Sequence, residues 1–268
     1  MIKKIFGLSL TLCVSLFGAI DKHELDGLKV GALVVKDLNT KHILYSKDGE
    51  KRASPASLTK VMTALLAIQS GKMNQAVTIT REMTKVEPTI AGYKHGDVVL
   101  MSDLVKAAMI KSDNDAAKAI AITVGGDEEH FIAMMNSKAR QIGMSHTHFS
   151  NPCGYDGKDH YSSPNDLLKM TEYAIKNSTF NAISKLNSHT YYALNKDKLK
   201  LFTAYTHNRL LNRYQYAVGV KTGFTNKAGA CLIARAKKDG KDCLIVMMNA
   251  KVDRWKTAKT IFEQVLES

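Results

Sequence analysis

The sequence predicts an α+β protein in which an antiparallel five-stranded sheet packs against a cluster of helices. Strand-like segments occur near both ends of the chain, and apolar residues recur at helical spacing between them. The chain shows neither an internal repeat nor an obvious linker, and its 268 residues include only 4 Pro and 17 Gly. We therefore expect one compact unit that is long enough to bury a sizeable core.

Five segments are expected to form the strands. Residues 28–36 and 42–46 flank a turn-forming segment, Asp37-Leu-Asn-Thr. The other three, 217–221, 229–236 and 243–250, lie near the C-terminus. Residues 237–242, Lys-Lys-Asp-Gly-Lys-Asp, are expected to be the hairpin turn between the last two.

The middle of the chain is expected to be helical. Helices are predicted over residues 58–69, 102–110, 114–125, 127–142 and 164–176. Ser102 and Asp103 can cap the second of these, and Ser163, followed by Pro164, can cap the last. A terminal amphipathic helix is expected from Trp255 to Leu266. Its apolar face is more simply explained by packing on the sheet than by a membrane anchor.

The first 19 residues have the pattern of a secretory signal peptide. Lys3 and Lys4 form a basic start, residues 5–17 are uncharged and mostly apolar, and Gly18 and Ala19 are small. The apolar stretch is shorter than the ~20 residues that a spanning helix needs. We predict a signal peptide over residues 1–19, a single domain over residues 20–268, export, and no transmembrane span in the mature chain. An uncleaved anchor is the alternative.

The charge balance is strongly basic, with 38 Lys+Arg against 25 Asp+Glu and a net charge of +13. Without the signal, 36 basic residues against 25 acidic ones leave +11. Exported proteins do not normally meet nucleic acid, so we expect no nucleic-acid partner. The positive field would face cell wall or lipid head groups, or would simply be solvated.

Cysteine and histidine spacing gives no support for a metal site. Cys153, Cys231 and Cys243 would remain after signal removal, and an odd number cannot form a closed disulfide framework. The chain has no CxxC, and His146-x-His148 lacks a convincing zinc spacing. We expect no metal site, and buried thiols at Cys231 and Cys243.

The first candidate for chemistry is Ser57-Leu-Thr-Lys60. In the opening turn of a helix, residues three apart share a face, so the Ser57 hydroxyl and the Lys60 amine can meet. Lysine can then take the serine proton if burial or a second cation lowers its pKa. Taken alone, the segment is equally well explained by a capped helix with an exposed lysine.

Two further candidates follow. Ser112-Asp-Asn114 lies at the junction of two predicted helices, where an N-cap cluster is the alternative explanation. Lys221-Thr222-Gly223 lies on an apolar strand. There Thr222 can bind a carboxylate, Lys221 adds positive charge, and Gly223 lets an extended substrate approach the backbone. An edge strand with a solubilising lysine is the alternative.

The order and spacing of the three motifs are more specific than each motif alone. Ser112 follows Ser57 by 55 residues, and Lys221 follows Ser112 by 109. The set resembles the signature of penicillin-binding proteins and serine β-lactamases. The surrounding residues 56–63, 112–117 and 221–229 resemble the low-molecular-mass D-alanyl-D-alanine carboxypeptidase family. This resemblance covers essentially the whole mature chain and implies the transpeptidase-like fold of that family.

The resemblance also implies residue roles in the hydrolysis of a D-alanyl-D-alanine bond. Ser57 would be the nucleophile, acylated by the penultimate D-alanine of a peptidoglycan stem peptide. Lys60 would be its general base, and Ser112 would relay a proton to the leaving amine. The oxyanion hole would be the backbone N–H groups of Ser57 and Phe224.

The remaining roles concern binding. Asn114 would hold the peptide backbone, Lys221 would keep the site positive, and Thr222 would bind the terminal carboxylate. The reaction would need no metal or organic cofactor. Stem peptides would be the substrates and β-lactam antibiotics covalent inhibitors. Residues 20–268 would be a single catalytic domain in the periplasm or on the cell-wall face of the membrane.

Two departures from the family pattern leave the preferred bond open. Many relatives carry a second, β-rich domain and a C-terminal amphipathic anchor, whereas we expect neither here. Single-domain relatives include endopeptidases that cut cross-links between stem peptides. His207 also stands just before Asn208, where relatives often have an arginine that holds the substrate carboxylate. Arg209 is a possible substitute.

Two other classes were weighed. A class A β-lactamase needs a glutamate that activates the deacylating water, usually in Glu-x-x-x-Asn. The residues four after Glu128, Glu129 and Glu172 are Ile132, Ala133 and Lys176. A non-catalytic wall-binding or penicillin-sensing protein would keep the pocket without turnover, and no feature of the sequence supports it.

Overall fold

The main sheet confirms the predicted fold class. The computed structural model describes residues 20–267, so the predicted signal peptide lies outside the described residues. The sheet has the order β2-β1-β9-β8-β7, and every neighbouring pair is antiparallel. Its strands are β1 (Val30–Asp37), β2 (Ile43–Lys47), β7 (Ala217–Thr225), β8 (Gly229–Lys238) and β9 (Lys241–Ala250).

The predicted six-residue turn between the last two strands is wrong in length. Lys237 pairs with Asp242 and Lys238 with Lys241, so the strands continue into the expected loop. Only Asp239 and Gly240 make the turn. Both have positive φ, as a tight turn between antiparallel strands requires.

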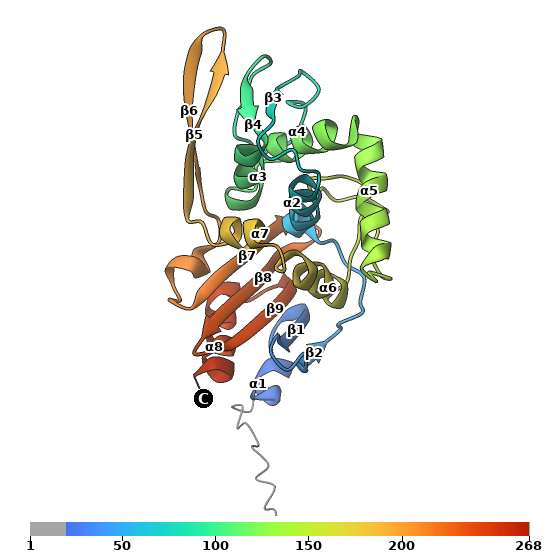
Figure 1. Ribbon diagram of the computed structural model, residues 1–268. Coiled ribbons are helices and arrows are strands. Elements are labelled where there is room, and N and C mark those ends of the chain that lie inside the picture. The colour runs from blue at the N-terminus through green and yellow to red at the C-terminus, as the bar shows by residue number, and fades with distance from the viewer. Residues whose placement is uncertain (1–19, 268) are drawn as a thin grey trace, which may run out of the picture.

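Helices cover both faces of this sheet (Figure 1). On one side lie α2 (Lys60–Gln69), α3 (Met101–Ile110), α4 (Asn114–Gly125), α5 (Glu128–Gln141), α6 (Pro164–Ala174) and α7 (Ser178–Ser184). The short α1 (Lys22–Asp26) and the terminal α8 (Arg254–Leu266) lie on the other side. Each side encloses its own apolar core. Trp255, Ile261 and Phe262 of α8 are buried there, which confirms the packing explanation for its apolar face.

The helix starts follow the sequence signals with one exception. Ser163 accepts the Asp166 N–H and caps α6 as predicted. The predicted cap of α3 is wrong, because α3 begins one residue earlier and its N-cap is Leu100, which has no side-chain acceptor. A 3₁₀ turn, η1 (Ala56–Thr59), directly precedes α2, so Ser57 and Lys60 lie on either side of this junction.

A second sheet was not predicted from the sequence. It contains β3 (Ala76–Thr78), β4 (Val98–Leu100), β5 (Ser188–Asn195) and β6 (Lys198–Tyr205), in the order β3-β4-β5-β6. β5 and β6 form a long hairpin that projects beyond the helix cluster (Figure 1).

Cys153, Cys231 and Cys243 are free and buried. None of the helices in residues 20–267 combines the length and hydrophobicity needed to cross a bilayer.

Candidate active site

Ser57 and Lys60 meet at the junction of η1 and α2. The Lys60 Nζ lies 3.0 Å from the Ser57 Oγ. It also donates to the Asn114 Oδ1 at 2.7 Å and to the Cys153 carbonyl at 2.6 Å. Lys60 has no exposed surface, so these three acceptors take the place of water. The alternative of a capped helix with an exposed lysine does not describe this residue.

Burial lowers the pKa of Lys60 to about 8. The Cys153 thiol and the carboxylates of Asp113 and Asp115 oppose the shift, since negative charge favours the ammonium form. An amine with this pKa can lose its proton near neutral pH. This position and this pKa are what a general base for the Ser57 hydroxyl would need.

The second and third motifs meet across the site from Ser57. The Lys221 Nζ donates to the Ser112 Oγ at 2.9 Å and to the Thr222 carbonyl at 3.0 Å. Lys221 is buried, and its pKa lies well below the usual range because of burial first, then the positive charges of Lys60 and Arg254. Ser112 has a φ of 71°, a left-handed conformation that costs energy in a non-glycine residue and is concentrated at functional sites.

Asn114 is placed by the structure next to Lys60. Its Oδ1 accepts from Lys60, and its Nδ2 donates to the Glu87 carbonyl at 2.8 Å. The Asn114 amide thus links the buried amine to the segment that forms a wall of the cleft. Its role in holding a peptide backbone stays a prediction.

β7 brings the third motif alongside Ser57. A Cβ at Gly223 would lie 3.1 Å from the Ala56 Cβ and 3.2 Å from the Ser57 N, so glycine lets the strand pack directly on η1. Thr222 is largely buried, whereas the Phe224 side chain is 63% exposed at the cleft. The close approach that Gly223 permits in the structure is between β7 and the turn that carries Ser57. The approach of a substrate to the same backbone stays a prediction.

Ser57 lies where two hollows meet. One, of about 420 Å³, is lined by Ser57, Asn114, Glu87 and Asp156 among others. The other, of about 710 Å³, is lined by Ser57, Thr222, His207, Arg209, Arg254 and their neighbours. The cleft can therefore receive an extended chain across the serine, with a cationic surface on one side only.

Arg254 was missed by the sequence analysis. It lies at the start of α8, and its Nη1 donates to the carbonyls of Gly223 and Cys231, each at 2.8 Å. These bonds hold its guanidinium beside Thr222 in the larger of the two hollows at Ser57. Because Arg209 and Arg254 line it, we call this the basic hollow. The only signal for it in the sequence was the predicted start of the terminal helix.

His207 and Arg209 both line the basic hollow. The pKa of His207 is lowered, chiefly by burial and then by the charges of Lys221, Lys111, Arg254 and Arg209. A neutral imidazole supplies no charge to a carboxylate, so the two arginines provide the cationic groups of this hollow.

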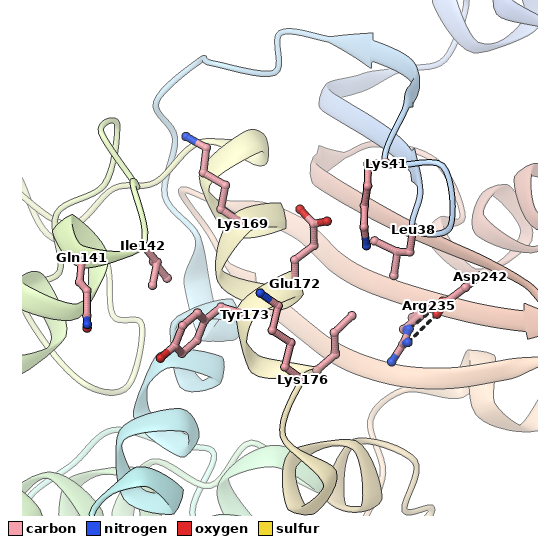
Figure 2. A pocket seen from close by; sticks show the side chains of 11 residues that line it. Leu38, Lys41, Gln141, Ile142, Lys169, Glu172, Tyr173, Lys176, Arg235 and Asp242 are labelled. Carbon is pink, nitrogen blue, oxygen red and sulfur yellow. Dashed lines mark hydrogen bonds and ion pairs between the residues drawn. The ribbon is translucent and has the colours of Figure 1, made fainter.

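A different hollow, of about 620 Å³, lies between α6 and the ends of β1, β8 and β9 (Figure 2). Lys41, Lys176 and the Arg235–Asp242 ion pair line it. None of the residues predicted for the site does so. It is separate from the cleft that contains Ser57.

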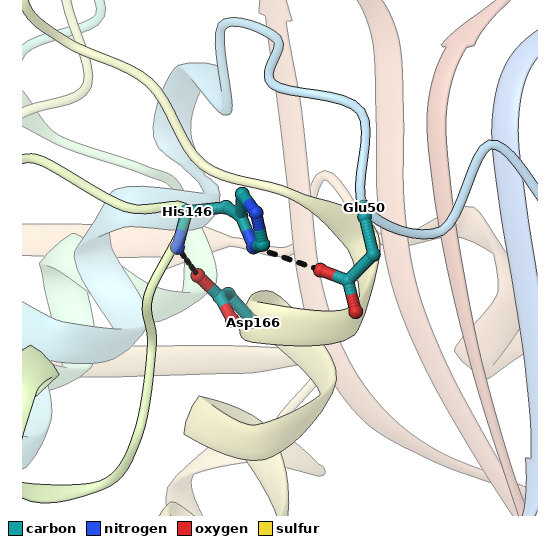
Figure 3. A group of neighbouring side chains, drawn as sticks. All are labelled: Glu50, His146 and Asp166. Atoms are coloured by element: carbon teal, nitrogen blue, oxygen red, sulfur yellow. Dashed lines mark hydrogen bonds and ion pairs between the residues drawn. The ribbon is translucent and has the colours of Figure 1, made fainter.

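Within residues 20–267, one group of side chains could be close enough to share a metal ion: Glu50, His146 and Asp166 (Figure 3). Their polar atoms already have protein partners. The His146 Nδ1 contacts Glu50 at 2.9 Å, and Asp166 accepts the His146 N–H. The Lys169 ammonium occupies the other Asp166 oxygen. This group ties two loops together and gives no argument for a metal.

Comparison with known proteins identifies the family of the chain. The family model described as D-alanyl-D-alanine carboxypeptidase, peptidase family S11, matches residues 21–252. D-alanyl-D-alanine carboxypeptidase DacF of Bacillus subtilis is 33% identical over 86% of this chain, which spans 59% of that relative. A D-alanyl-D-alanine endopeptidase of Haemophilus influenzae is 32% identical over 75% of this chain and 68% of its own length.

A solved structure gives the same result for the fold. The crystal structure of the Streptomyces K15 DD-transpeptidase superimposes with a TM-score of 0.85 and 29% identity, covering 88% of this chain and 97% of that one. The fold is thus that of the DD-peptidase class of penicillin-binding proteins. More narrowly, the chain belongs to the D-alanyl-D-alanine carboxypeptidase family, peptidase family S11.

Proposed function

We propose that the protein is a serine-type D-alanyl-D-alanine carboxypeptidase that removes the terminal D-alanine from peptidoglycan stem peptides. The observation that carries this proposal is the buried Lys60 amine 3.0 Å from the Ser57 hydroxyl. Family membership and the Lys221–Ser112 contact opposite this pair support it.

In the first half of the reaction, the Ser57 oxygen attacks the carbonyl carbon of the penultimate D-alanine, and the Lys60 amine takes the serine proton. The tetrahedral oxyanion is held by the backbone N–H groups of Ser57 and Phe224. Collapse breaks the C–N bond, and the proton that Lys60 took passes by way of Ser112 to the leaving amine, so that Lys60 is neutral again. Terminal D-alanine departs and an acyl-serine remains.

In the second half, water attacks the acyl carbonyl, with Lys60 again accepting a proton. The Ser57–acyl bond breaks, and the proton returns to the serine oxygen. The shortened stem peptide leaves as a carboxylate. Every proton in this cycle is carried by side chains of the chain or by water, and no metal or organic cofactor takes part.

The basic hollow explains why the substrate would be a terminal dipeptide. The Thr222 hydroxyl would donate a hydrogen bond to the terminal carboxylate, with Arg254 and Arg209 supplying positive charge. Lys221 lies behind Thr222, but burial lowers its pKa well below the usual range, so the positive charge of this part of the site comes from Arg254 and Arg209. Charged groups that are excluded from water add strongly to carboxylate recognition.

The alternative is an endopeptidase that cuts cross-links between stem peptides. The resemblance to the Haemophilus endopeptidase favours it, and so does His207, whose neutral ring weakens the demand for a carboxylate at this position. The chemistry at Ser57 would be the same.

A class A β-lactamase is disfavoured by the positions of the glutamates between the second and third motifs. None of Glu128, Glu129 and Glu172 lines either hollow at Ser57. Glu172 instead pairs with Lys36 at 2.8 Å.

The non-catalytic alternative is disfavoured because the Ser57 hydroxyl and the Lys60 amine lie within hydrogen-bond distance of each other.

The proposed substrate is part of the cell wall, so we expect the protein to work there. We infer export through residues 1–19, a catalytic domain within residues 20–268, and activity in the periplasm or on the wall face of the membrane. β-Lactams, which mimic the terminal dipeptide, would acylate Ser57 and leave slowly.

The test is mass spectrometry of purified muropeptides after incubation with the protein. A pentapeptide monomer and a cross-linked dimer are used in parallel, with Ser57→Ala as the control. Loss of one alanine from the monomer alone is the expected result. Conversion of dimer to monomers, with the pentapeptide intact, would support the endopeptidase and contradict the carboxypeptidase. If neither product forms, both proposed functions are wrong.

A further inference from the structure

His160 is a buried histidine to which the proposed function gives no role. It lies between α5 and α6, its side chain is 2% exposed, and it is not among the residues that line either hollow at Ser57. Its two ring nitrogens contact two different segments. The Nε2 lies 2.9 Å from the Thr59 Oγ1, and the Nδ1 accepts the Ser150 N–H at 3.0 Å. One side chain thus joins η1 to the loop that precedes α6.

These partners fix the position of the ring proton. A backbone N–H can only donate, so the Nδ1 of His160 is the acceptor and carries no proton. In a neutral imidazole the proton is then on Nε2, which donates it to the Thr59 hydroxyl oxygen. The Thr59 hydroxyl in turn donates to the Ala56 carbonyl at 2.8 Å. The hydrogen bonds therefore run in one direction, from the Ser150 N–H to the residue just before Ser57.

Burial keeps this ring neutral. The pKa of His160 is lowered to about 4, first by burial and then by the charge of His148. Asp156 opposes the shift, and Lys60 adds to it. A protonated ring would turn an Nδ1–H toward the Ser150 N–H, so two donors would face each other. The neutral form is the one that keeps both hydrogen bonds.

The loop at the other end of His160 holds an acceptor of the Lys60 amine. The Asn151 Oδ1 accepts the N–H groups of Cys153 and Gly154 at 3.1 and 2.7 Å, which closes a tight turn. That turn directs the Cys153 carbonyl at the Lys60 Nζ, 2.6 Å away. The Asn151 Nδ2 lies 3.4 Å from the His160 Nδ1. His160 therefore contacts both the turn of the proposed nucleophile and the turn that holds its proposed base.

We propose that His160 is a positioning residue for acyl transfer: by joining η1 to residues 150–154, it holds the Ser57 hydroxyl and the Lys60 amine in register. This inference rests on the proposed function. Among the described residues the ring has no hydrogen bond with Ser57 or Lys60, so it acts on them through Thr59 and the loop. Small displacements of reacting groups are costly, since about 1 Å can lower a rate about 100-fold.

Three variants separate this role from packing. His160→Phe keeps a ring against Phe149, whose centroid is 5.9 Å from that of His160, and removes both hydrogen bonds. His160→Gln places an amide N–H near the Nε2 position, so it can still donate to Thr59. His148→Phe is the matched control, because His148 is an exposed histidine that precedes the same loop.

The experiment is stopped-flow acylation of the full chain by a fluorescent penicillin over a range of concentrations. It yields a maximal acylation rate and an apparent Kd for each variant. Rates are expressed per active site, counted from the final labelling stoichiometry, so that misfolded protein does not contribute. We expect His160→Phe to lower the maximal rate about 10- to 100-fold and to change the apparent Kd less than about twofold. His160→Gln should recover at least about threefold of this loss, and His148→Phe should match wild type.

An unchanged maximal rate per active site in His160→Phe would overturn the proposal. A change confined to the apparent Kd would also overturn it, because it would assign His160 to ligand binding. So would an equal fall in His148→Phe, or a fall in His160→Gln as deep as in His160→Phe. The wild-type rate distinguishes this inference from the proposed function. A wild-type chain that is not acylated overturns both, whereas normal acylation of wild type and His160→Phe overturns only the role of His160.

Discussion

The Lys60 amine lies 3.0 Å from the Ser57 hydroxyl and has no contact with bulk water. The two residues are held together because η1 ends where α2 begins, and because the Asn114 and Cys153 oxygens fix the position of the amine. A buried amine beside a hydroxyl is the arrangement that a serine nucleophile and its general base require.

Replacement of Lys60 by methionine should abolish most acylation while leaving the fold intact. Methionine fills a similar volume and removes a buried amine that costs energy to desolvate. Loss of a general base typically costs about 100- to 10,000-fold, and we expect a fall in this range for the acylation rate by a fluorescent penicillin. Lys72→Met is the control, because Lys72 donates to Thr123 away from the cleft. Equal rates in wild type and Lys60→Met would remove Lys60 from the base role.

The acylation rate should rise with pH through the pKa of Lys60. The base must be neutral, and the pKa of Lys60 is about 8, so the neutral fraction is small at pH 7 and dominant above pH 9. Stopped-flow acylation between pH 6 and pH 10 would show an increase with a midpoint near that value. A rate that is constant or falls across this range would contradict the assignment.

The same shift has a stability consequence of defined sign. The pKa of Lys60 is about 8 in the fold, below the 10.5 that is usual for lysine. A lowered lysine pKa means that the unfolded chain binds more protons between these two values. Lys60 therefore disfavours folding below about pH 8, and this penalty diminishes as pH rises toward 10.5. Urea unfolding of wild type and Lys60→Met should give a difference in stability that narrows over this interval.

Arg254→Ala should weaken turnover of substrates that end in a free carboxylate. Hydrogen bonds to charged groups contribute about 1.5–3 kcal/mol, so kcat/KM for a D-alanyl-D-alanine peptide should fall about 10- to 100-fold. Arg213→Ala is the matched control, because Arg213 is half exposed and pairs with Asp253 outside the basic hollow. An equal fall in kcat/KM in both variants would indicate a general effect of removing a positive charge and would contradict a specific role of Arg254.

Two glycines with positive φ separate backbone strain from lack of space. A Cβ at Gly154 would lie 2.0 Å from the Ala56 carbonyl oxygen, whereas one at Gly240 would meet nothing within 4 Å. Gly240→Ala should cost about 1–2 kcal/mol of unfolding free energy from φ strain alone. Gly154→Ala should cost more than about 4 kcal/mol and disturb the turn that carries Ser57. Urea unfolding measures both, and similar costs would contradict the close packing.

The motif residues could be predicted from sequence because their order and spacing are set by chemistry. Ser57 and Lys60 are three residues apart on one helical turn, which is a local relationship. The contact between Lys221 and Ser112 is not local. The family resemblance implied that both residues belong to one site, but the contact itself was not predicted. The φ of Ser112 has no signal in the sequence, since it is imposed by the junction of α3 and α4.

Arg254 could not be predicted, for a topological reason. It follows Lys221 by 33 residues, and only the return of the chain through β8 and β9 brings the start of α8 back beside β7. A helix start in sequence gives no indication of which strand it will face.

The β5–β6 hairpin was missed because its alternation is misleading. In Lys198-Leu-Lys-Leu201, period-2 alternation would predict that the leucines face the core. In the structure Leu199 and Leu201 face solvent, and Phe202 and Ala204 face inward. The usual rule that the apolar face of a strand is buried therefore fails at this hairpin.

The most direct test of the account is the position of the penicillin adduct. Wild-type protein is acylated with benzylpenicillin, digested, and sequenced by tandem mass spectrometry, with Ser57→Ala in parallel. The account predicts an adduct on Ser57, distinguishable from Ser54 in the same peptide, and none in the variant despite an unchanged circular dichroism spectrum. An adduct on another residue, or one that persists in Ser57→Ala, would contradict it.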